Sequence, residues 1–168
     1  MVNVRLRVAV PDDVAFVTAT ERGPGFENMV GQWSERHHLD AMASADYAYL
    51  IGTDATKTPR AFAILRDLSD SHGNVCLKRI AVTDPGQGFG SVFFGKVVTW
   101  TFNNTDAHRL WLDVLADNGR AQHVYQAHGF AGEGRLRDAF RLPNGRRIDL
   151  LLMSVLRSEW QRRQPGAA

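Results

Sequence analysis

The sequence LKRIAVTDPGQGFGSVFFGKVVTWTFN, residues 77–103, decides the fold. Residues 77–82 form a mostly apolar run typical of a central strand, and the following turn has glycines at 86, 88 and 90. Residues 91–103 carry apolar side chains at helical spacing. A strand that leads through a glycine-rich turn into a helix suits phosphate binding, because the backbone can approach the anion and the first helical N–H groups face it.

The segments around this stretch predict the rest of the fold. Residues 108–114 form a second strand after the helix, and two strands joined by a helical crossover should be parallel neighbours. The other expected strands cover residues 3–8, 46–51, 61–66, 135–140 and 147–156, and further helices begin at Pro11, Ser34 and Asn118. The Asn144-Gly145 pair predicts a hairpin. The sequence therefore predicts a single-domain α/β fold, with a mixed, mostly antiparallel sheet of about six to seven strands, a central parallel pair and helices on both faces.

Length and composition limit the number of domains and the classes of function that the chain can have. The chain has 168 residues, 44% hydrophobic and 23% charged, which predicts one domain over residues 1–160 and a frayed tail over residues 161–168. The 20 basic residues are interleaved with 18 acidic ones and form no stripe with aromatic residues, which argues against a nucleic-acid surface. No apolar run reaches the roughly 18 residues of a membrane span, and the start of the chain has no signal-peptide pattern. With Cys76 as the one cysteine, we expect a cytoplasmic protein without disulfides or a metal site.

Two phosphate-binding motifs fail on spacing. Residues 90–96 match the first seven positions of a nucleoside-triphosphate loop, but Val97 stands where a hydroxyl must bind magnesium, and residues 91–94 belong to a helical pattern. The dinucleotide fingerprint requires Gly-x-Gly-x-x-Gly, whereas this turn reads Gly-x-Gly-x-Gly and follows the fourth strand instead of the first.

The whole stretch resembles the acetyl-coenzyme A site of the GCN5-related N-acetyltransferase superfamily. The family loop, Arg/Gln-x-x-Gly-x-Gly/Ala, aligns with residues 85–90, and the block Asn-x-x-Ala-x-x-x-Tyr-x-x-x-Gly-Phe aligns with residues 118–130. Together these motifs cover about a third of the chain in the right order. The sequence around Trp111 and near the C-terminus most resembles the branch of the superfamily that acetylates ribosomal proteins.

The resemblance implies a set of cofactor-binding residues and exposes one departure. The residues implied to bind acetyl-coenzyme A are Ile80, Ala81, Val82, Gly86, Gln87, Gly88, Phe89, Gly90, Ser91, Asn118, Ala121 and Tyr125. The first loop position, usually Arg or Gln, is Pro85. Sliding the motif to place Gln87 there would put Val92 at a Gly/Ala position, so the first alignment is preferred.

Catalytic roles follow from the same resemblance. Tyr125 matches the general acid that protonates the coenzyme A thiolate, and a phenol is protonated at neutral pH. The family's central strand has a bulge whose N–H polarises the thioester, expected here near residues 80–82. No general base stands out; the candidates are Glu21, Glu27, Glu35, His37 and His38.

The resemblance therefore implies an acetyl-coenzyme A-dependent N-acetyltransferase that acts on a primary amine. A protein N-terminal amine is the first candidate acceptor, and a small polyamine-like amine is the alternative. A non-catalytic acyl-coenzyme A-binding module is the competing class of function. The apolar run at residues 150–156 suggests pairing across a homodimer.

Overall fold

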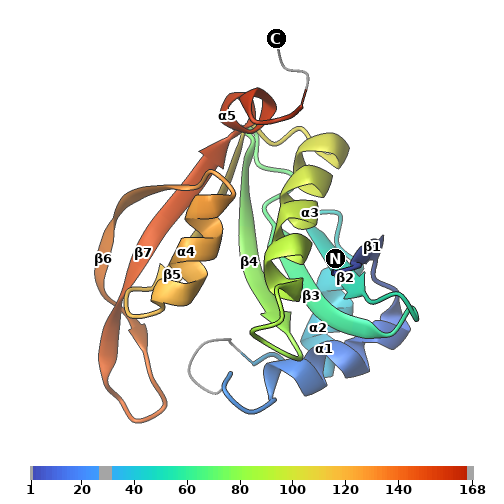
Figure 1. Ribbon diagram of the computed structural model, residues 1–168. Coiled ribbons are helices and arrows are strands. Elements are labelled where there is room, and N and C mark those ends of the chain that lie inside the picture. The colour runs from blue at the N-terminus through green and yellow to red at the C-terminus, as the bar shows by residue number, and fades with distance from the viewer. Residues whose placement is uncertain (1, 27–31, 166–168) are drawn as a thin grey trace.

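The computed structural model describes residues 2–26 and 32–165. Seven strands and six helical segments follow one another along this part of the chain (Figure 1). The strands are β1 (Arg5–Val8), β2 (Tyr47–Thr53), β3 (Pro59–Arg66), β4 (Asn74–Val82), β5 (Arg109–Leu115), β6 (Ala131–Arg141) and β7 (Arg147–Leu156). The helices are the 3₁₀ turn η1 (Pro11–Asp13), α1 (Val14–Glu21), α2 (Glu35–Met42), α3 (Phe89–Asn104), α4 (Gly119–Ala127) and α5 (Arg157–Arg162).

The strands form one sheet in the order β1-β2-β3-β4-β5-β7-β6. Strands β4 and β5 are parallel, as predicted from the helical crossover, and the other neighbours are antiparallel. The mixed, mostly antiparallel sheet predicted from the sequence is therefore confirmed.

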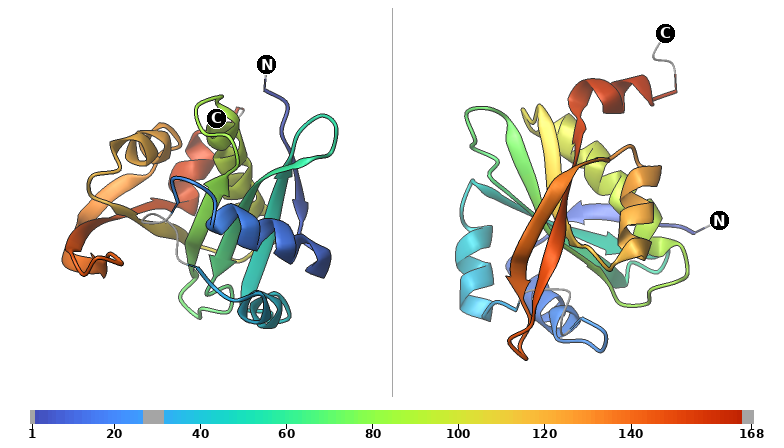
Figure 2. Two further views of the ribbon diagram at one scale, coloured as in Figure 1. Left: turned by 90° about the horizontal axis from the view of Figure 1, so that it is seen from below. Right: turned by 90° about the vertical axis from the view of Figure 1, so that its left-hand side faces the viewer.

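Helices cover both faces of the sheet (Figure 2). The strand residues alternate between the faces, because successive side chains point to opposite sides. On β3, Ala61, Ala63 and Leu65 belong to the cluster under α3 and α4, whereas Phe62 and Ile64 belong to the cluster under α1 and α2. The apolar runs of the central strands are thus the pattern of strands buried on both faces.

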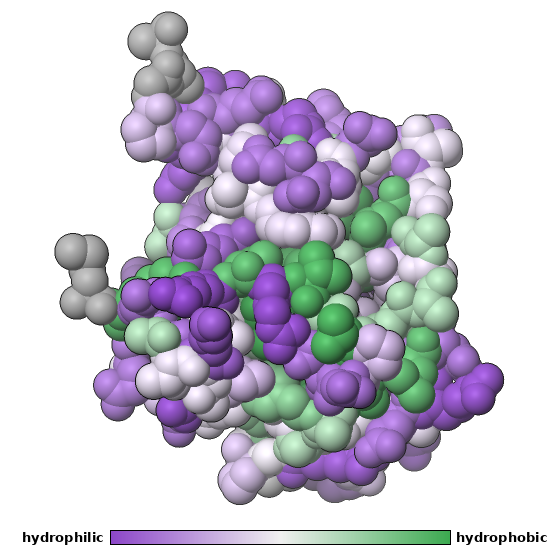
Figure 3. Space-filling view, turned by 90° about the vertical axis from the view of Figure 1, so that its right-hand side faces the viewer, coloured by the Kyte–Doolittle hydropathy of each residue, from purple (hydrophilic) through white to green (hydrophobic). Residues whose placement is uncertain are grey.

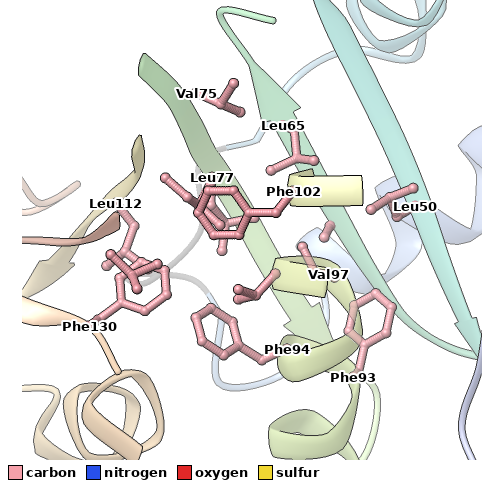
Figure 4. Close-up of a cluster of buried hydrophobic side chains, with 14 of the residues drawn as sticks. Leu50, Leu65, Val75, Leu77, Phe93, Phe94, Val97, Phe102, Leu112 and Phe130 are labelled. Atoms are coloured by element: carbon pink, nitrogen blue, oxygen red, sulfur yellow. The ribbon is translucent and has the colours of Figure 1, made fainter. Parts of the chain in front are cut away.

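The larger cluster joins α3 to the middle of the sheet (Figure 4). Phe93, Phe94 and Val97 of α3 are essentially inaccessible to solvent and pack against the central strands. Helix α3 packs against the sheet along its length. This packing positions its first turn at the end of β4, where the glycine-rich turn lies.

The C-terminal segment contains a helix that was not predicted. Helix α5 continues to Arg162, two residues into the segment expected to fray. The Arg163 guanidinium after it donates to the Ala127 carbonyl oxygen over 2.8 Å. Residues 150–156 lie in β7, which is hydrogen-bonded to β5 on one side and to β6 on the other. The open strand edge of this hairpin therefore belongs to β6, and the homodimer suggested by residues 150–156 stays a prediction.

Apolar side chains also reach the surface on the side of β1 and α3. Figure 3 shows apolar surface across the middle of that side of the molecule. The exposed side chains on these two elements include Val8 and Val92. No helix in the described residues combines the length and the apolar character needed to cross a membrane.

Candidate functional site

Strands β4 and β5 part after a short paired region, and a cavity opens between them. Their parallel pairing covers Asn74–Cys76 of β4 and Arg109–Trp111 of β5. Beyond it, residues 77–80 and 112–115 line the cavity, which has a volume of about 430 Å³. That volume lies within the range of small-molecule sites. The cavity thus lies at the centre of the sheet, between the two strands.

Strand β4 contains a β-bulge beside this cavity, in its pairing with β3. Leu65 of β3 pairs with Leu77 and Ile64 pairs with Arg79, so Lys78 is an extra residue without a partner in the register. The bulge expected near residues 80–82 is therefore located at Lys78 instead. The expectation was wrong because the position of a bulge depends on the register with β3, which a motif on β4 alone does not specify.

The glycine-rich turn adopts the conformations that its glycines permit. Gly86 and Gly88 have φ angles of 108° and 78°, and α3 begins at Phe89 with Gly88 as its N-cap. A Cβ atom on Gly90 would lie 3.4 Å from the Val82 side chain, so the helix approaches β4 closely at this point. The first intrahelical bond joins the Val92 N–H to the Gly88 carbonyl, so the N–H groups before Val92 in the first turn have no acceptor within the helix. This end of α3 can accept an anion.

The hydroxyl of Ser91 is engaged elsewhere. Its Oγ lies 3.1 Å from Nε2 of His128, which follows α4. Burial lowers the pKa of His128, so the neutral imidazole is favoured. Ser91 was predicted to bind the cofactor, and its backbone N–H remains the group with which it could do so.

Tyr125 lies at the other side of the cavity, on α4. Asn118 caps this helix by accepting a hydrogen bond from the Ala121 N–H over 3.1 Å, as its position in the sequence predicts. The Tyr125 ring packs on Phe94 with a centroid distance of 4.8 Å. Burial, and secondarily the charge of Asp113, raise the pKa of Tyr125 to about 12. The phenol is therefore fully protonated at neutral pH, and its hydroxyl has no hydrogen-bond partner within the part of the chain that the structure describes.

The predicted site residues divide between two places. Ile80, Asn118, Ala121 and Tyr125 line the cavity. The turn residues Gly86, Gln87, Gly88, Phe89, Gly90 and Ser91 lie outside it, at the N-terminus of α3. Ala81 is buried in the cluster on the opposite face, and Val82 packs beside α3, so only their backbone can face a ligand in the cavity.

A buried network of charged and polar groups lies behind the bulge. Oε1 of Glu21 accepts a hydrogen bond from Arg79 over 2.7 Å, and its Oε2 lies 3.1 Å from Nε2 of His38. The other ring nitrogen of His38 lies 2.9 Å from the Tyr49 hydroxyl. Glu21 and His38 are fully buried, and the Arg79 guanidinium lies 4.2 Å from the Trp33 ring centroid. The network ties α1 and α2 to β4, next to the residue that bulges.

The five candidate bases do not converge on the cavity. Glu21 and His38 are enclosed in the network, while Glu35 and His37 are exposed on α2. Glu27 lies outside the described residues. None of the four described candidates lines the cavity. Within the described ranges, the acidic side chain of the lining is Asp113, on β5.

Possible metal ligands do not cluster in the described part of the chain. In residues 2–26 and 32–165, no three His, Cys, Asp or Glu side chains gather closely enough to hold an ion. Cys76 is buried, and burial raises the pKa of its thiol to about 11.

Comparison with known proteins identifies relatives of the chain. The model of the Acetyltransferase (GNAT) family matches residues 19–130. The chain is 32% identical over 84 residues to spermidine N(1)-acetyltransferase of Vibrio cholerae, and the aligned residues make up 50% of this chain and 48% of that protein. It is 29% identical over 82 residues to the putative ribosomal N-acetyltransferase YdaF of Bacillus subtilis, and here the aligned residues make up 49% of this chain and 44% of that protein. The chain thus spans about half the length of the curated relatives it matches.

Solved structures share the whole fold. Spermidine N-acetyltransferase from Vibrio cholerae in complex with CoA and spermine superposes with a TM-score of 0.84 at 22% identity, covering 94% of this chain and 97% of that one. A chimera of the Vibrio cholerae enzyme and hSSAT gives a TM-score of 0.86 at 22% identity, covering 95% and 99%. At this identity the likeness establishes the fold.

Proposed function

Because the chain belongs to the Acetyltransferase (GNAT) family, we propose that it transfers the acetyl group of acetyl-coenzyme A to a primary amine. The observation that carries the proposal is the cavity between β4 and β5. One wall is formed by the part of β4 that contains the bulge, and the other wall includes Tyr125 with its protonated hydroxyl. A thioester held in this cavity would have backbone donors on one side and an acid on the other.

Acetyl-coenzyme A would bind along the edge of β4 and across the start of α3. The backbone of Ile80, Ala81 and Val82 would pair with the pantetheine arm, because β4 has no ladder partner on the β5 side beyond Cys76. The N–H groups of the turn, from Gly86 to Ser91, would bind the phosphates. Asn118 and Ala121 would contact the cofactor from α4.

The reaction would proceed by direct attack. The lone pair of the neutral amine forms a C–N bond with the thioester carbon, and the carbonyl electrons move to oxygen, where a backbone N–H at the bulge beside Lys78 stabilises the oxyanion. Collapse re-forms the carbonyl and breaks the C–S bond. The sulfur takes the proton of the Tyr125 hydroxyl and leaves as the thiol, and the proton lost by the amine restores the phenol through solvent. Positioning alone would lower the barrier by about 7 to 11 kcal/mol.

We propose a polyamine as the first acceptor to test. Two similarities support this choice: the match to spermidine N(1)-acetyltransferase and the likeness to a fold that holds CoA and spermine. Asp113 in the cavity lining supplies a negative charge that would attract an ammonium group. A protein N-terminal amine is the second candidate, supported by the match to a putative ribosomal N-acetyltransferase.

A thiol-release assay tests the function and separates the acceptors. The protein is incubated with acetyl-coenzyme A and either spermidine, spermine or peptides with free N-termini, each at equal concentration. We expect thiol release that depends on the amine, with the polyamines fastest. Faster release with a peptide would move the acceptor to the second candidate. Tight acetyl-coenzyme A binding without thiol release from any amine would instead support a non-catalytic acyl-coenzyme A-binding module.

A further inference from the structure

The glycine-rich turn has no cationic side chain of its own. Residues 83–91 contain one charged residue, Asp84, and its charge has the wrong sign for a phosphate site. Asp84 lies 3.3 Å from Arg60, but Arg60 is also held by Asp54 over 2.9 Å. Arg60 is therefore shared between two carboxylates. A dianionic pyrophosphate at this turn would find N–H groups and no free cation from the turn itself.

Arg120 approaches the turn from a different element. It lies in the first turn of α4, which Asn118 caps, and its side chain is exposed. A Cβ atom on Gly86 would lie 3.7 Å from Nη2 of Arg120, so the guanidinium is next to the turn backbone. Within the described ranges no carboxylate forms an ion pair with Arg120, and its guanidinium makes no hydrogen bond. Arg120 is thus an unengaged cation beside the anion-binding turn.

We propose that Arg120 binds the pyrophosphate of acetyl-coenzyme A and replaces the loop side chain that Pro85 cannot supply. This inference rests on the proposed function. The planar guanidinium offers two parallel N–H groups to a phosphate, and such charge-assisted bonds are stronger than neutral ones. Gly86 is compatible with this arrangement, because its φ of 108° and missing side chain leave room for the guanidinium.

The contribution of Arg120 should fall on binding and not on the chemical step. The exposed site weakens the interaction, so we expect about a tenfold effect on affinity, at the low end for a hydrogen bond to a charged group. Arg120 does not line the cavity that would hold the thioester. Turnover at saturating acetyl-coenzyme A should therefore change little.

The test compares Arg120→Gln with Arg162→Gln, which removes an exposed arginine of α5. Calorimetry measures the Kd of coenzyme A, of 3′-dephospho-coenzyme A and of pantetheine, which has no phosphate. We expect Arg120→Gln to raise the Kd about tenfold for both phosphorylated ligands and to leave pantetheine unchanged, while Arg162→Gln leaves all three unchanged. Unfolding temperatures of the two variants without ligand check that the fold is kept.

A complementary variant restores the missing charge from the loop. If Arg120 replaces the loop side chain, Pro85→Arg should recover most of the affinity lost in Arg120→Gln. Unchanged coenzyme A affinity in Arg120→Gln would overturn the proposal, as would a loss that disappears with 3′-dephospho-coenzyme A, since this would assign Arg120 to the ribose phosphate. A wild-type protein that binds no coenzyme A would refute the proposed function instead.

Discussion

Replacing Glu21 with glutamine tests the buried network that joins the helices to β4. Both carboxylate oxygens are acceptors: Oε1 for Arg79, and Oε2 for His38 and, at 3.4 Å, for the Trp33 N–H. Glutamine keeps one acceptor oxygen and introduces an amide N–H₂, which would face a donor. The substitution also leaves the Arg79 guanidinium, whose side chain is 6% exposed, without its counter-charge.

The expected loss is large because the groups are inaccessible to water. Removing one partner of a buried ion pair costs about 3 to 5 kcal/mol, since the remaining charge is buried without compensation. For a domain of this length, each kcal/mol lowers the melting temperature by about 2 to 4 °C. We therefore expect Glu21→Gln to melt about 10 °C below the wild type.

Chemical and thermal unfolding measure this loss, with Asp40→Asn as the matched control. Asp40 pairs with Arg36 on the surface of α2, and its removal should cost less than about 0.5 kcal/mol. The double variant Glu21→Gln/Arg79→Met also removes the buried, uncompensated guanidinium, so it should be more stable than Glu21→Gln alone. A loss below 1 kcal/mol for Glu21→Gln, or a double variant that is less stable still, would refute the argument from uncompensated charge.

Three further predictions concern the proposed acid, a close contact and a titrating pair. Tyr125→Phe should lower thiol release at least tens-fold with unchanged coenzyme A affinity; unchanged turnover would assign the acid elsewhere. Gly52→Ala places a Cβ atom 2.6 Å from Cδ2 of the buried Phe93 ring, and should lower the urea midpoint by the equivalent of about 1 to 3 kcal/mol; an equal midpoint would contradict the packing. Hydrogen bonds from Arg7 lower the pKa of Asp13 from 3.8, so this carboxylate stabilises the fold above about pH 4 and loses the effect as the pH falls through the lowered pKa. Asp13→Asn should cost about 1 kcal/mol at pH 7, allowing for the exposure of Arg7, and the gap to the wild type should close in acid; a constant gap would show that the pair does not titrate.

The fold could be predicted where local patterns determine it. The parallel pair and the caps Ser34 and Asn118 follow from periodicity and from side chains that act within one turn. The start of β6 was missed because Gly132 and Gly134 disfavour a strand, and pairing with β7 overrides that preference. Helix α5 was missed because the hydrogen bonds that stabilise its first residue come from far away in the sequence. The Arg157 guanidinium donates to the carbonyl oxygens of Phe102, Thr105 and Ala107, which lie 55, 52 and 50 positions away.

The candidate site was less predictable because its parts come from distant segments. Glu21 and Arg79 are 58 positions apart, and Ser91 and His128 are 37 apart, so no spacing rule connects them. Arg79 did leave a signal, because a charged residue inside a buried strand requires a partner. Arg120 left none, since its proximity to Gly86 depends on how α4 packs beside α3.

The bulge at Lys78 explains why alternate side chains of β4 point to one face of the sheet before it and to the other face after it. In a regular strand, residues 77, 79 and 81 would point to the same side. Here Leu77 packs in the cluster under α3, whereas Ala81 packs under α1 and α2 and Arg79 binds Glu21 of α1. The extra residue shifts the alternation by one, because a one-residue slip moves every later side chain to the other face. The network and the irregular pairing of β4 with β3 are therefore coupled, because Arg79 can reach Glu21 only if the strand bulges before it. The bulged residue, Lys78, also lines the cavity.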